Sequence, residues 1–256
     1  MPKFFVNSDQ IDEKKVTIIG EDVNHIKNVL RLKVDDNIQV CNKDSGINYE
    51  CGINLIEKDY IQCIIFKELN SKSEPENIYI NIFQGLPKQE KMELIIQKCI
   101  ELGVAKITPV EMERCVVKLD SKNKEKKVER WNKISETAAK QCNRDIVPKI
   151  NNVINIKNIC NMIQDYDIVL LAYENEKENT LKNELKKIKE LKSKDKFKIA
   201  IIIGPEGGLD EKEVEILREN GAKVVTLGNR ILRTETVAFV LTSIIMYELS
   251  DLGGNI

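Results

Sequence analysis

Histidine is nearly missing from this 256-residue chain, which contains one, and its seven cysteines form no Cys-x-x-Cys pair. This scattered spacing argues against a zinc site and against a disulfide framework, and an odd number of dispersed thiols suits a reducing cytosol. No apolar run approaches the length of a membrane span, and no apolar segment before a cleavage-like site marks the N-terminus. The sequence therefore predicts a soluble, cytoplasmic protein with no metal and no membrane association.

An excess of positive charge is also lacking, because 40 Lys and Arg residues stand against 41 Asp and Glu residues. This balance excludes a uniformly basic coat for nucleic acid, so any RNA site has to be a local patch. The polar stretch 70–77, which contains Pro75, separates a β-rich part from a part in which strand and helix patterns alternate. We therefore predict two domains, residues 1–73 and 74–256.

The N-terminal part consists of short strand-like runs separated by turn signals, at spacings typical of a small antiparallel barrel. One helical turn, Asp22 to Arg31, interrupts these runs and carries His25. The predicted strands cover residues 4–6, 15–19, 37–41, 48–53 and 60–66.

Alternating strands and helices in the second part predict βαβ units, and hence an α/β fold with a parallel sheet flanked by helices. The last helix is apolar around much of its circumference, so part of it is expected to meet another subunit. The predicted strands cover 78–83, 107–110 and 168–174, and the predicted helices cover 92–102, 131–144, 176–198 and 236–249, after a charged run at 120–133.

Residues 199–241 carry the strongest functional signal. The β-branched run 199–203 predicts a strand buried on both faces, and Gly204-Pro205-Glu206-Gly207-Gly208 follows as a loop that can approach a ligand closely. Asp210 then begins a helix with Glu213 as its capping-box partner, and Gly221 follows its end.

A second strand at 223–227 ends at Gly228, in a second glycine loop. We expect the two loops at the carboxyl ends of two neighbouring strands, where open α/β sheets bind ligands. The strand at 168–174 is expected to end beside the same site.

These motifs resemble the SPOUT class of S-adenosylmethionine-dependent RNA methyltransferases and, more narrowly, the RsmE family, which methylates N3 of a uridine in 16S ribosomal RNA. The resemblance covers almost the whole chain. It is carried by Gly-Pro-Glu-Gly-Gly at 204–208, Leu-Gly-x-x-Ile-Leu-Arg-x-Glu-Thr at 227–236, Leu86-Pro87-Lys88, Glu101-Leu102-Gly103-Val104, the helix 130–144, and His25 with Val29-Leu30-Arg31. The resemblance implies an α/β-knot fold with a C-terminal trefoil knot, a PUA-like RNA-binding β-barrel at the N-terminus, and a homodimer.

The resemblance also implies which residues form the site. Backbone groups of the glycine loops would bind S-adenosylmethionine, and no metal is needed. The expected cofactor-binding residues are Ala172, Tyr173, Gly204, Pro205, Glu206, Gly207, Gly208, Leu227, Gly228, Ile231, Leu232, Arg233, Thr234 and Thr236. The family has alanine at the position of Val237, directly after the Glu-Thr pair.

Methyl transfer to uridine N3 requires removal of a proton and stabilisation of the resulting anion. Arg233 and Arg144 are candidates to stabilise the anion, and Glu206 and Glu235 are candidates to accept the proton. Each carboxylate could instead cap a helix or pair with Arg233, so the sequence does not assign the base.

The candidate RNA contacts are His25, Arg31, Lys88 and Arg144, and each has a structural alternative. His25 could be a hydrogen-bonded helix residue, Lys88 an exposed loop lysine, and either arginine a partner of a carboxylate. The expected partner is 16S ribosomal RNA, within the assembled small subunit.

Two other functions remain open at this point: a SPOUT enzyme that methylates another base or a ribose 2′-hydroxyl, and a non-catalytic RNA-binding protein with a decayed cofactor site. The barrel-first order and the His25 to Arg31 motif argue against the first, and the intact glycines and Arg233 argue against the second.

Overall fold

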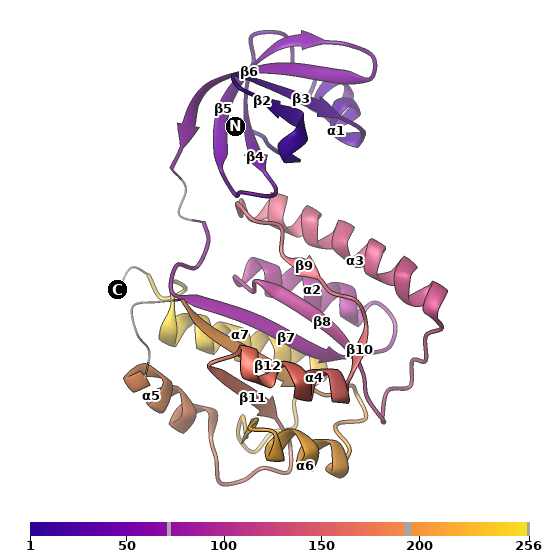
Figure 1. Cartoon of the computed structure of the whole chain (residues 1–256), viewed down its shortest axis with the longest axis vertical. Coiled ribbons are helices and arrows are strands. Elements are labelled where there is room, and N and C mark those ends of the chain that lie inside the picture. Colours follow the sequence, from indigo (N-terminus) through magenta and orange to yellow (C-terminus); the bar gives the residue numbers. More distant parts are fainter. Residues whose placement is uncertain (71–72, 192–195, 255–256) are drawn as a thin grey trace. The chain divides into compact units, whose positions relative to one another are not determined.

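The structure is a computed structural model that describes residues 1–70, 73–191 and 196–254 (Figure 1). It divides into two compact units, Met1–Glu74 with Ala139–Val147, and Pro75–Ala138 with Pro148–Ile256. Residues 139–147, which the sequence assigned to the second domain, thus group with the first unit. None of the helices in the described ranges is long and apolar enough to cross a membrane.

A seven-stranded sheet forms the centre of the second unit, and every strand pair in it is parallel. This confirms the predicted α/β class. The order is β10-β8-β7-β12-β11-β13, with β9 also paired to β8. The strands are β7 (Ile78–Gly85), β8 (Lys106–Glu111), β9 (Lys149–Ile150), β10 (Ile154–Asn155), β11 (Ile168–Ala172), β12 (Phe197–Ile203) and β13 (Lys223–Val225).

The central strand is β12, which lies between β7 and β11 and is buried on both faces, as its apolar sequence predicts. The expectation that the two glycine loops follow neighbouring strands is wrong. Strand β13 pairs with residues 170–172 of β11, so β11 lies between β12 and β13. The ends of three consecutive strands meet at this edge of the sheet, and β11 is the third strand that was expected beside the site.

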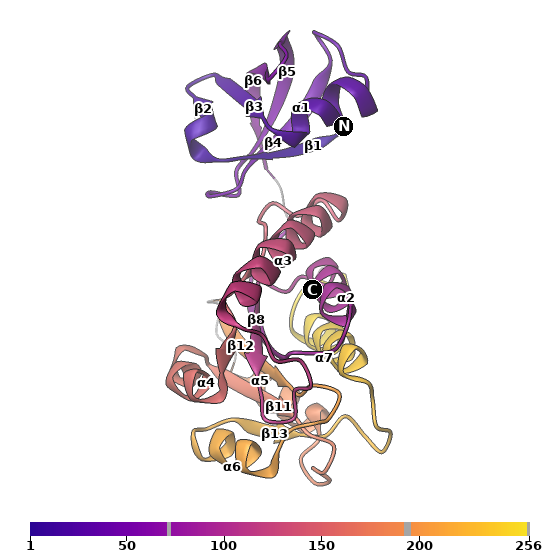
Figure 2. The same cartoon turned by 90° about the vertical axis from the view of Figure 1, so that its right-hand side faces the viewer.

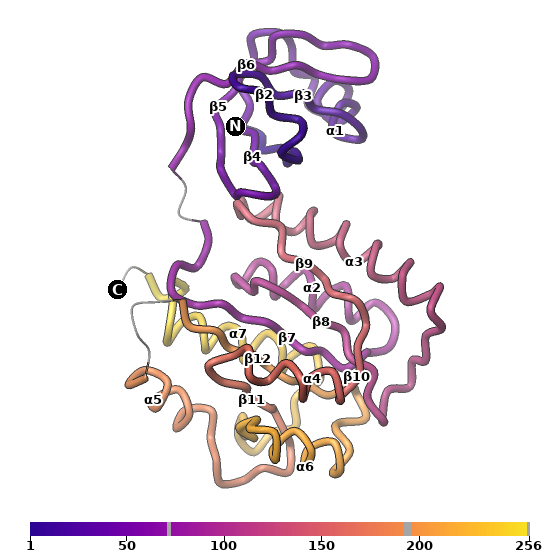
Figure 3. Tube along the Cα trace, viewed as in Figure 1, coloured from indigo at the N-terminus to yellow at the C-terminus, as the bar shows by residue number. Residues whose placement is uncertain are grey.

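Helices cover both faces of this sheet. Figure 2 shows α4 and α6 on one side of the strands and α2 and α7 on the other, and Figure 3 traces the chain through β7, α2 and β8. The capping box predicted for α6 is present. The Asp210 carboxylate accepts a hydrogen bond from the backbone N–H of Lys212, and the Glu213 carboxylate accepts one from the backbone N–H of Asp210. The helices are α2 (Lys91–Glu101), α3 (Ser121–Gln141), α4 (Ile156–Met162), α5 (Leu181–Leu191), α6 (Glu211–Glu219) and α7 (Thr234–Leu249).

Two predicted helices have different limits in the structure. The charged run and the helix predicted at 131–144 form one helix, α3, which ends at Gln141 because Asn143 adopts a left-handed conformation with φ of 58°. Arg144 therefore lies beyond the end of the helix that was predicted to contain it. The helix predicted at 176–198 is the shorter α5; residues 192–195 lie outside the described residues, and residues 197 and 198 belong to β12.

A six-stranded sheet in the order β1-β4-β5-β6-β3-β2 forms the first unit. The prediction of a purely antiparallel barrel is wrong for one pair, because β1 runs parallel to β4. No hairpin links these two strands, so nothing in the connection requires them to be antiparallel. The strands are β1 (Lys3–Val6), β2 (Ile11–Asp12), β3 (Lys15–Ile19), β4 (Asn37–Asn42), β5 (Asn48–Ile56) and β6 (Tyr60–Leu69).

The core of the first unit contains apolar side chains from its strands and from one helical segment. That segment is α1 (Glu21–Asn24), which continues as a π-helical turn over His25–Val29. Val23 and Ile26 from this segment are buried with Phe4, Ile38 and other strand residues. The helical turn predicted from Asp22 is thus present and contributes to the core.

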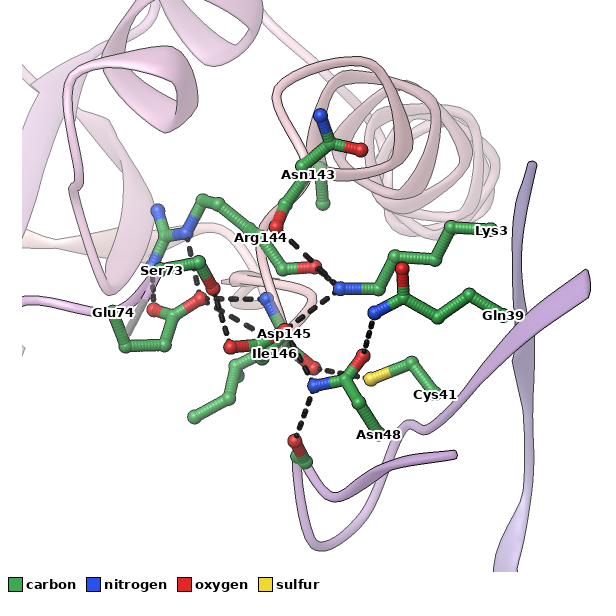
Figure 4. A network of polar contacts seen from close by, with 12 residues as sticks. Lys3, Gln39, Cys41, Asn48, Ser73, Glu74, Asn143, Arg144, Asp145 and Ile146 are labelled. Carbon is green, nitrogen blue, oxygen red and sulfur yellow. Dashed lines mark hydrogen bonds and ion pairs between the residues drawn. The ribbon is translucent and has the colours of Figure 1, made fainter. Parts of the chain in front are cut away.

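Residues 143–146 are held in the first unit by a buried polar cluster (Figure 4). The Asp145 carboxylate accepts hydrogen bonds from Lys3 Nζ at 2.7 Å, Asn48 Nδ2 at 2.6 Å and Ser73 Oγ at 2.5 Å. Nearby, the Glu74 carboxylate accepts from Arg144 Nε at 3.1 Å and from the backbone N–H of Asp145 at 3.0 Å. We call this set the Asp145 cluster and define it as Lys3, Asn48, Ser73, Glu74, Arg144 and Asp145.

Candidate active site

A cleft of about 740 Å³ lies at the carboxyl ends of β11, β12 and β13. Because parallel strands end at the same edge of a sheet, the segments that follow these three strands meet there. Nearly all the residues predicted to bind the cofactor line this cleft, and they are Ala172, Tyr173, Gly204, Pro205, Glu206, Gly208, Leu227, Gly228, Ile231, Leu232, Arg233 and Thr234. The structure thus brings together loops that are separated in the sequence.

Two predicted residues, Gly207 and Thr236, are not among the described residues that line the cleft. At Gly207 an added Cβ would lie 3.0 Å from the carbonyl oxygen of Arg114, so this glycine permits a close approach to a different loop. Thr236 is the third residue of α7, and the residues of this helix that line the cleft are Thr234 and Val237.

Several lining residues were not predicted. The segment after β11 contributes acidic and polar side chains, and Lys91 comes from the beginning of α2, far away in the sequence. The position of Lys91 directly after a strand-loop motif was the one sequence signal that pointed to it. The unpredicted residues are Lys91, Glu174, Glu176, Lys177, Thr180, Ile203, Leu209, Thr226, Asn229, Arg230 and Val237.

Glycine is required by the backbone at one position in each loop. Gly208 has φ of 71°, and an added Cβ would lie 2.5 Å from Glu174 Oε1. Gly228 has φ of 107°, in the second loop. Residues with a Cβ rarely adopt these angles, so the glycines fix the course of both loops around the cleft.

Thr234 connects the two sides of the cleft. Its buried Oγ1 donates to the carbonyl oxygen of Gly204 at 2.7 Å and accepts from Gln84 Nε2 at 2.9 Å. Gln84 lies near the end of β7, and within the described ranges its buried Oε1 has no hydrogen-bond partner. One hydroxyl therefore joins the end of β7, the first glycine loop and the beginning of α7.

Lys91 makes a second, ionic connection between the same loop and helix. Its Nζ lies 3.2 Å from Glu206 Oε1 and 3.4 Å from Glu235 Oε2. The alternative that these carboxylates pair with Arg233 is therefore wrong, because both pair with Lys91. Hydrogen bonding to Glu206, together with the charge of Glu235, raises the pKa of Lys91, which keeps the ammonium charged.

Glu206 is held in its ionised form. Burial favours the neutral carboxyl, but hydrogen bonds from its own backbone and from the N–H of Lys88, together with Lys91, lower its pKa below the usual range. Lys88 N–H donates to Glu206 Oε1 at 2.9 Å. A carboxylate stabilised in this way is a weak proton acceptor at neutral pH.

The candidate arginines lie in different environments. Arg233 is exposed, lines the cleft and forms no ion pair with any residue that the structure describes. Arg144 is 4% exposed, belongs to the first unit and forms an ion pair with Glu74, so the structural alternative is the one observed. Its guanidinium is not among the groups that line the cleft.

The other predicted RNA-binding residues are at the surface of their units. His25 is exposed, and its ring meets the Phe4 ring edge-on with centroids 6.0 Å apart. Arg31 is exposed and has φ of 54°, an uncommon conformation for a residue with a side chain. Lys88 is exposed and contacts Glu206 through its backbone.

Comparison with known proteins identifies the family. Residues 74–246 match an RNA methyltransferase domain, and residues 18–66 match an RNA methyltransferase PUA domain. The chain is 38% identical to ribosomal RNA small subunit methyltransferase E of Bacillus subtilis, over the whole of both chains. The chain belongs to the RsmE family.

Solved structures agree with membership of the RsmE family. A Neisseria gonorrhoeae ribosomal RNA small subunit methyltransferase E bound to S-adenosylmethionine is 27% identical, with a TM-score of 0.83 over 98% of this chain and 99% of that chain. A methyltransferase from Legionella pneumophila with bound cofactor is 26% identical, with a TM-score of 0.84 over 98% of each chain. The predicted combination of an N-terminal PUA-like domain and a SPOUT methyltransferase fold is confirmed, and the trefoil knot stays a prediction of the RsmE resemblance.

In the described part of the chain, no group of three or more His, Cys, Asp or Glu side chains could hold a metal ion. The charged groups that line the cleft include Lys91, which pairs with Glu206 and Glu235, and the exposed Arg230 and Arg233.

Proposed function

We propose that this protein transfers a methyl group from S-adenosylmethionine to N3 of a uridine in 16S ribosomal RNA. The observation that carries the proposal is the cleft bordered by both glycine loops, at the position where the RsmE resemblance implies the cofactor. Family membership over the full chain supports the reaction and the RNA substrate.

The residues of the cleft fit S-adenosylmethionine. A volume of about 740 Å³ lies in the range of sites for drug-sized ligands. The two glycine loops bring backbone N–H and C=O groups to the surface, where they can bind the ribose and the methionine end. Leu227, Ile231 and Leu232 provide apolar contacts for the adenine. When bound, the cofactor supplies an electrophilic methyl group on its sulfonium.

We assign to Arg233 the contact with the uridine that accepts the methyl group. Uridine N3 is a weak acid, and a guanidinium beside it stabilises the anion that attacks the methyl group. Arg233 lines the cleft and is exposed, so it is accessible to a nucleotide. Glu206 is a poor candidate for the base, because its donors favour the carboxylate.

RNA contact is assigned to exposed residues of the first unit and to Lys88. His25 and Arg31 flank the exposed apolar side chains of Val29 and Leu30, so this surface offers an imidazole and a guanidinium together with apolar area. Such a patch fits a chain with no overall positive charge. We place the RNA substrate of this protein within the assembled small ribosomal subunit, in the cytoplasm.

A homodimer through α7 completes the proposal. Ile244 and Tyr247 of α7 are 37% and 60% exposed, so this helix presents apolar area that a partner subunit could cover. A second cleft of about 530 Å³ lies between α5 and α7 and shares Leu227 and Gly228 with the cofactor cleft. A partner subunit bound there would border the second glycine loop.

Calorimetric titration with S-adenosylmethionine, followed by mass mapping of 16S ribosomal RNA from a deletion strain, tests the proposal. We expect micromolar binding, and a uridine that loses its N3 methyl group in the deletion strain and regains it on complementation. Loss of a methyl group from another base or from a ribose would support a different SPOUT activity. Absence of cofactor binding would support a non-catalytic RNA-binding protein.

A further inference from the structure

Three charged side chains at the cleft come from three separate elements. Lys91 is the first residue of α2, Glu206 lies in the first glycine loop, and Glu235 is the second residue of α7. The Lys91 ammonium lies within ion-pair distance of both carboxylates, 3.2 Å and 3.4 Å away. A single cation therefore joins the two segments that border the cofactor cleft.

The environment of Glu235 makes this cation important. Its side chain is 14% exposed. Its buried Oε2, the oxygen that lies 3.4 Å from Lys91 Nζ, forms no hydrogen bond within the described ranges. Its interaction with Lys91 thus offsets much of the cost of burying the charge. Glu206, by contrast, also accepts from the N–H of Lys88.

We propose that Lys91 is a positioning residue for the methyl transfer, whose ammonium holds the first glycine loop and the beginning of α7 at a fixed separation. The inference rests on the proposed function, since the separation matters only if the cleft binds the cofactor. Without Lys91, two carboxylates would face each other across this gap, and their repulsion would move the loop and the helix apart or favour protonation of one of them.

Other charged side chains lie near Lys91, Glu206 and Glu235, and none of them is altered in the variants that test the proposal. Glu93 of α2 pairs with Arg130, and Arg114 pairs with Asp210 beyond the first loop. Further charged groups of the cleft and of the packed segments are Lys88, Glu90, Glu174, Glu176, Lys177, Arg230 and Arg233. Their arrangement is common to all variants, so differences between variants report on the three bridged residues.

The test measures the dissociation constant of S-adenosylmethionine by calorimetry at pH 6 and pH 8. Lys91→Met is expected to weaken binding about tenfold at pH 8, as expected for a buried charge that loses its partner. Part of the loss should disappear at pH 6, because the pKa of one of the facing carboxyls rises and it takes up a proton. Wild-type binding should change little between the two pH values.

A second substitution distinguishes positioning from a general structural role. In Lys91→Met with Glu235→Gln the facing charges are gone, so binding should recover to within about threefold of wild type and lose its pH dependence. Lys91→Arg should also keep most of the affinity, since it preserves the cation. Lys98→Met, on the same helix and paired with Glu101 away from the cleft, is the matched control and should bind normally.

Unchanged affinity in Lys91→Met at pH 8, or no recovery in the double variant, overturns the proposal. If Lys91→Met does not fold, Glu206→Gln replaces it, because that variant releases the first loop while Lys91 still pairs with Glu235. A loss of about fivefold is then expected, and wild-type affinity overturns the proposal. Failure of the wild-type protein to bind the cofactor would instead contradict the proposed function itself.

Discussion

The two units each contain a cluster of charged side chains, and the two clusters differ in how completely they are hydrogen-bonded. In the Asp145 cluster both carboxylates accept several hydrogen bonds, and the Lys3 side chain is 3% exposed. At the cleft, Lys91 is 28% exposed, and one oxygen of Glu235 lacks a hydrogen bond among the described residues. A saturated, buried cluster fits a purely structural role, whereas an incomplete one beside a cleft fits a role in ligand binding.

The largest effect is expected from breaking the saturated cluster. Lys3→Met leaves the Asp145 carboxylate buried without its ammonium, and loss of one partner of a buried ion pair costs about 3–5 kcal/mol. The free energy of unfolding, measured by urea denaturation, should fall by this amount. Lys15→Met, an exposed position on β3 of the same unit, is the control. A loss below about 1 kcal/mol would show that the cluster is not structural.

The next largest effect is expected from the hydrogen bonds of the Thr234 hydroxyl at the cleft. Thr234→Val keeps the shape of the side chain but removes the hydrogen bonds of the hydroxyl to the Gly204 carbonyl and from Gln84 Nε2, which keeps only the Gly85 carbonyl, so the affinity for S-adenosylmethionine should fall about tenfold. Thr236→Val, at a position that does not line the cleft, should bind within about twofold of wild type. Equal losses in both variants would show that the beginning of α7 as a whole, rather than this hydroxyl, controls binding.

A smaller effect is expected from acid. The folded-state pKa of Glu206 is lowered, so its contribution to stability is complete above the ordinary value of 4.5 and is lost as the pH falls through the folded value. The difference in thermal midpoint between wild type and Glu206→Gln should therefore shrink as the pH is lowered from 6 to 3.5. Glu190→Gln, an exposed substitution on α5, should show no such trend. A constant difference would contradict the assigned pKa direction.

The smallest effect is expected from an ion pair that belongs to neither cluster. Lys189 pairs with Glu248, but the two side chains are 49% and 38% exposed. Such pairs contribute about 0.5 kcal/mol or less, so Lys189→Met should change the free energy of unfolding by no more than this. Lys186→Met on the same helix provides the comparison. A loss above about 1 kcal/mol would show that exposure alone does not separate weak pairs from strong ones.

Local sequence signals predicted much of the fold. The capping box of Asp210 and Glu213 involves residues three apart, and the β-branched run of β12 needs no information from elsewhere in the chain. The parallel pairing of β1 with β4 and the insertion of β11 between β12 and β13 were missed. Strand order depends on tertiary packing, which the residues of a single strand do not encode.

Site residues were predicted where they belong to a motif within one loop. They were missed where the interacting side chains are far apart in the sequence. Twelve residues of the two loops and β11 were found from the sequence motifs and line the cleft. Lys91 meets Glu235 from another helix, and Arg144 meets Glu74 across 70 positions of sequence. An ion pair between distant residues leaves no periodic pattern, so the family resemblance alone favoured a substrate-facing Arg144 slightly over the pairing with a carboxylate that the structure shows.

The Asp145 cluster also determines when the first unit can finish folding during synthesis. Lys3, Asn48 and Glu74 each form hydrogen bonds with Arg144 or Asp145, so the unit cannot be completed until residue 147 has emerged from the ribosome. We expect nascent chains stalled before this segment to be cleaved readily by added protease, and longer ones to resist it. Order of translation and order of folding are therefore not the same in this chain.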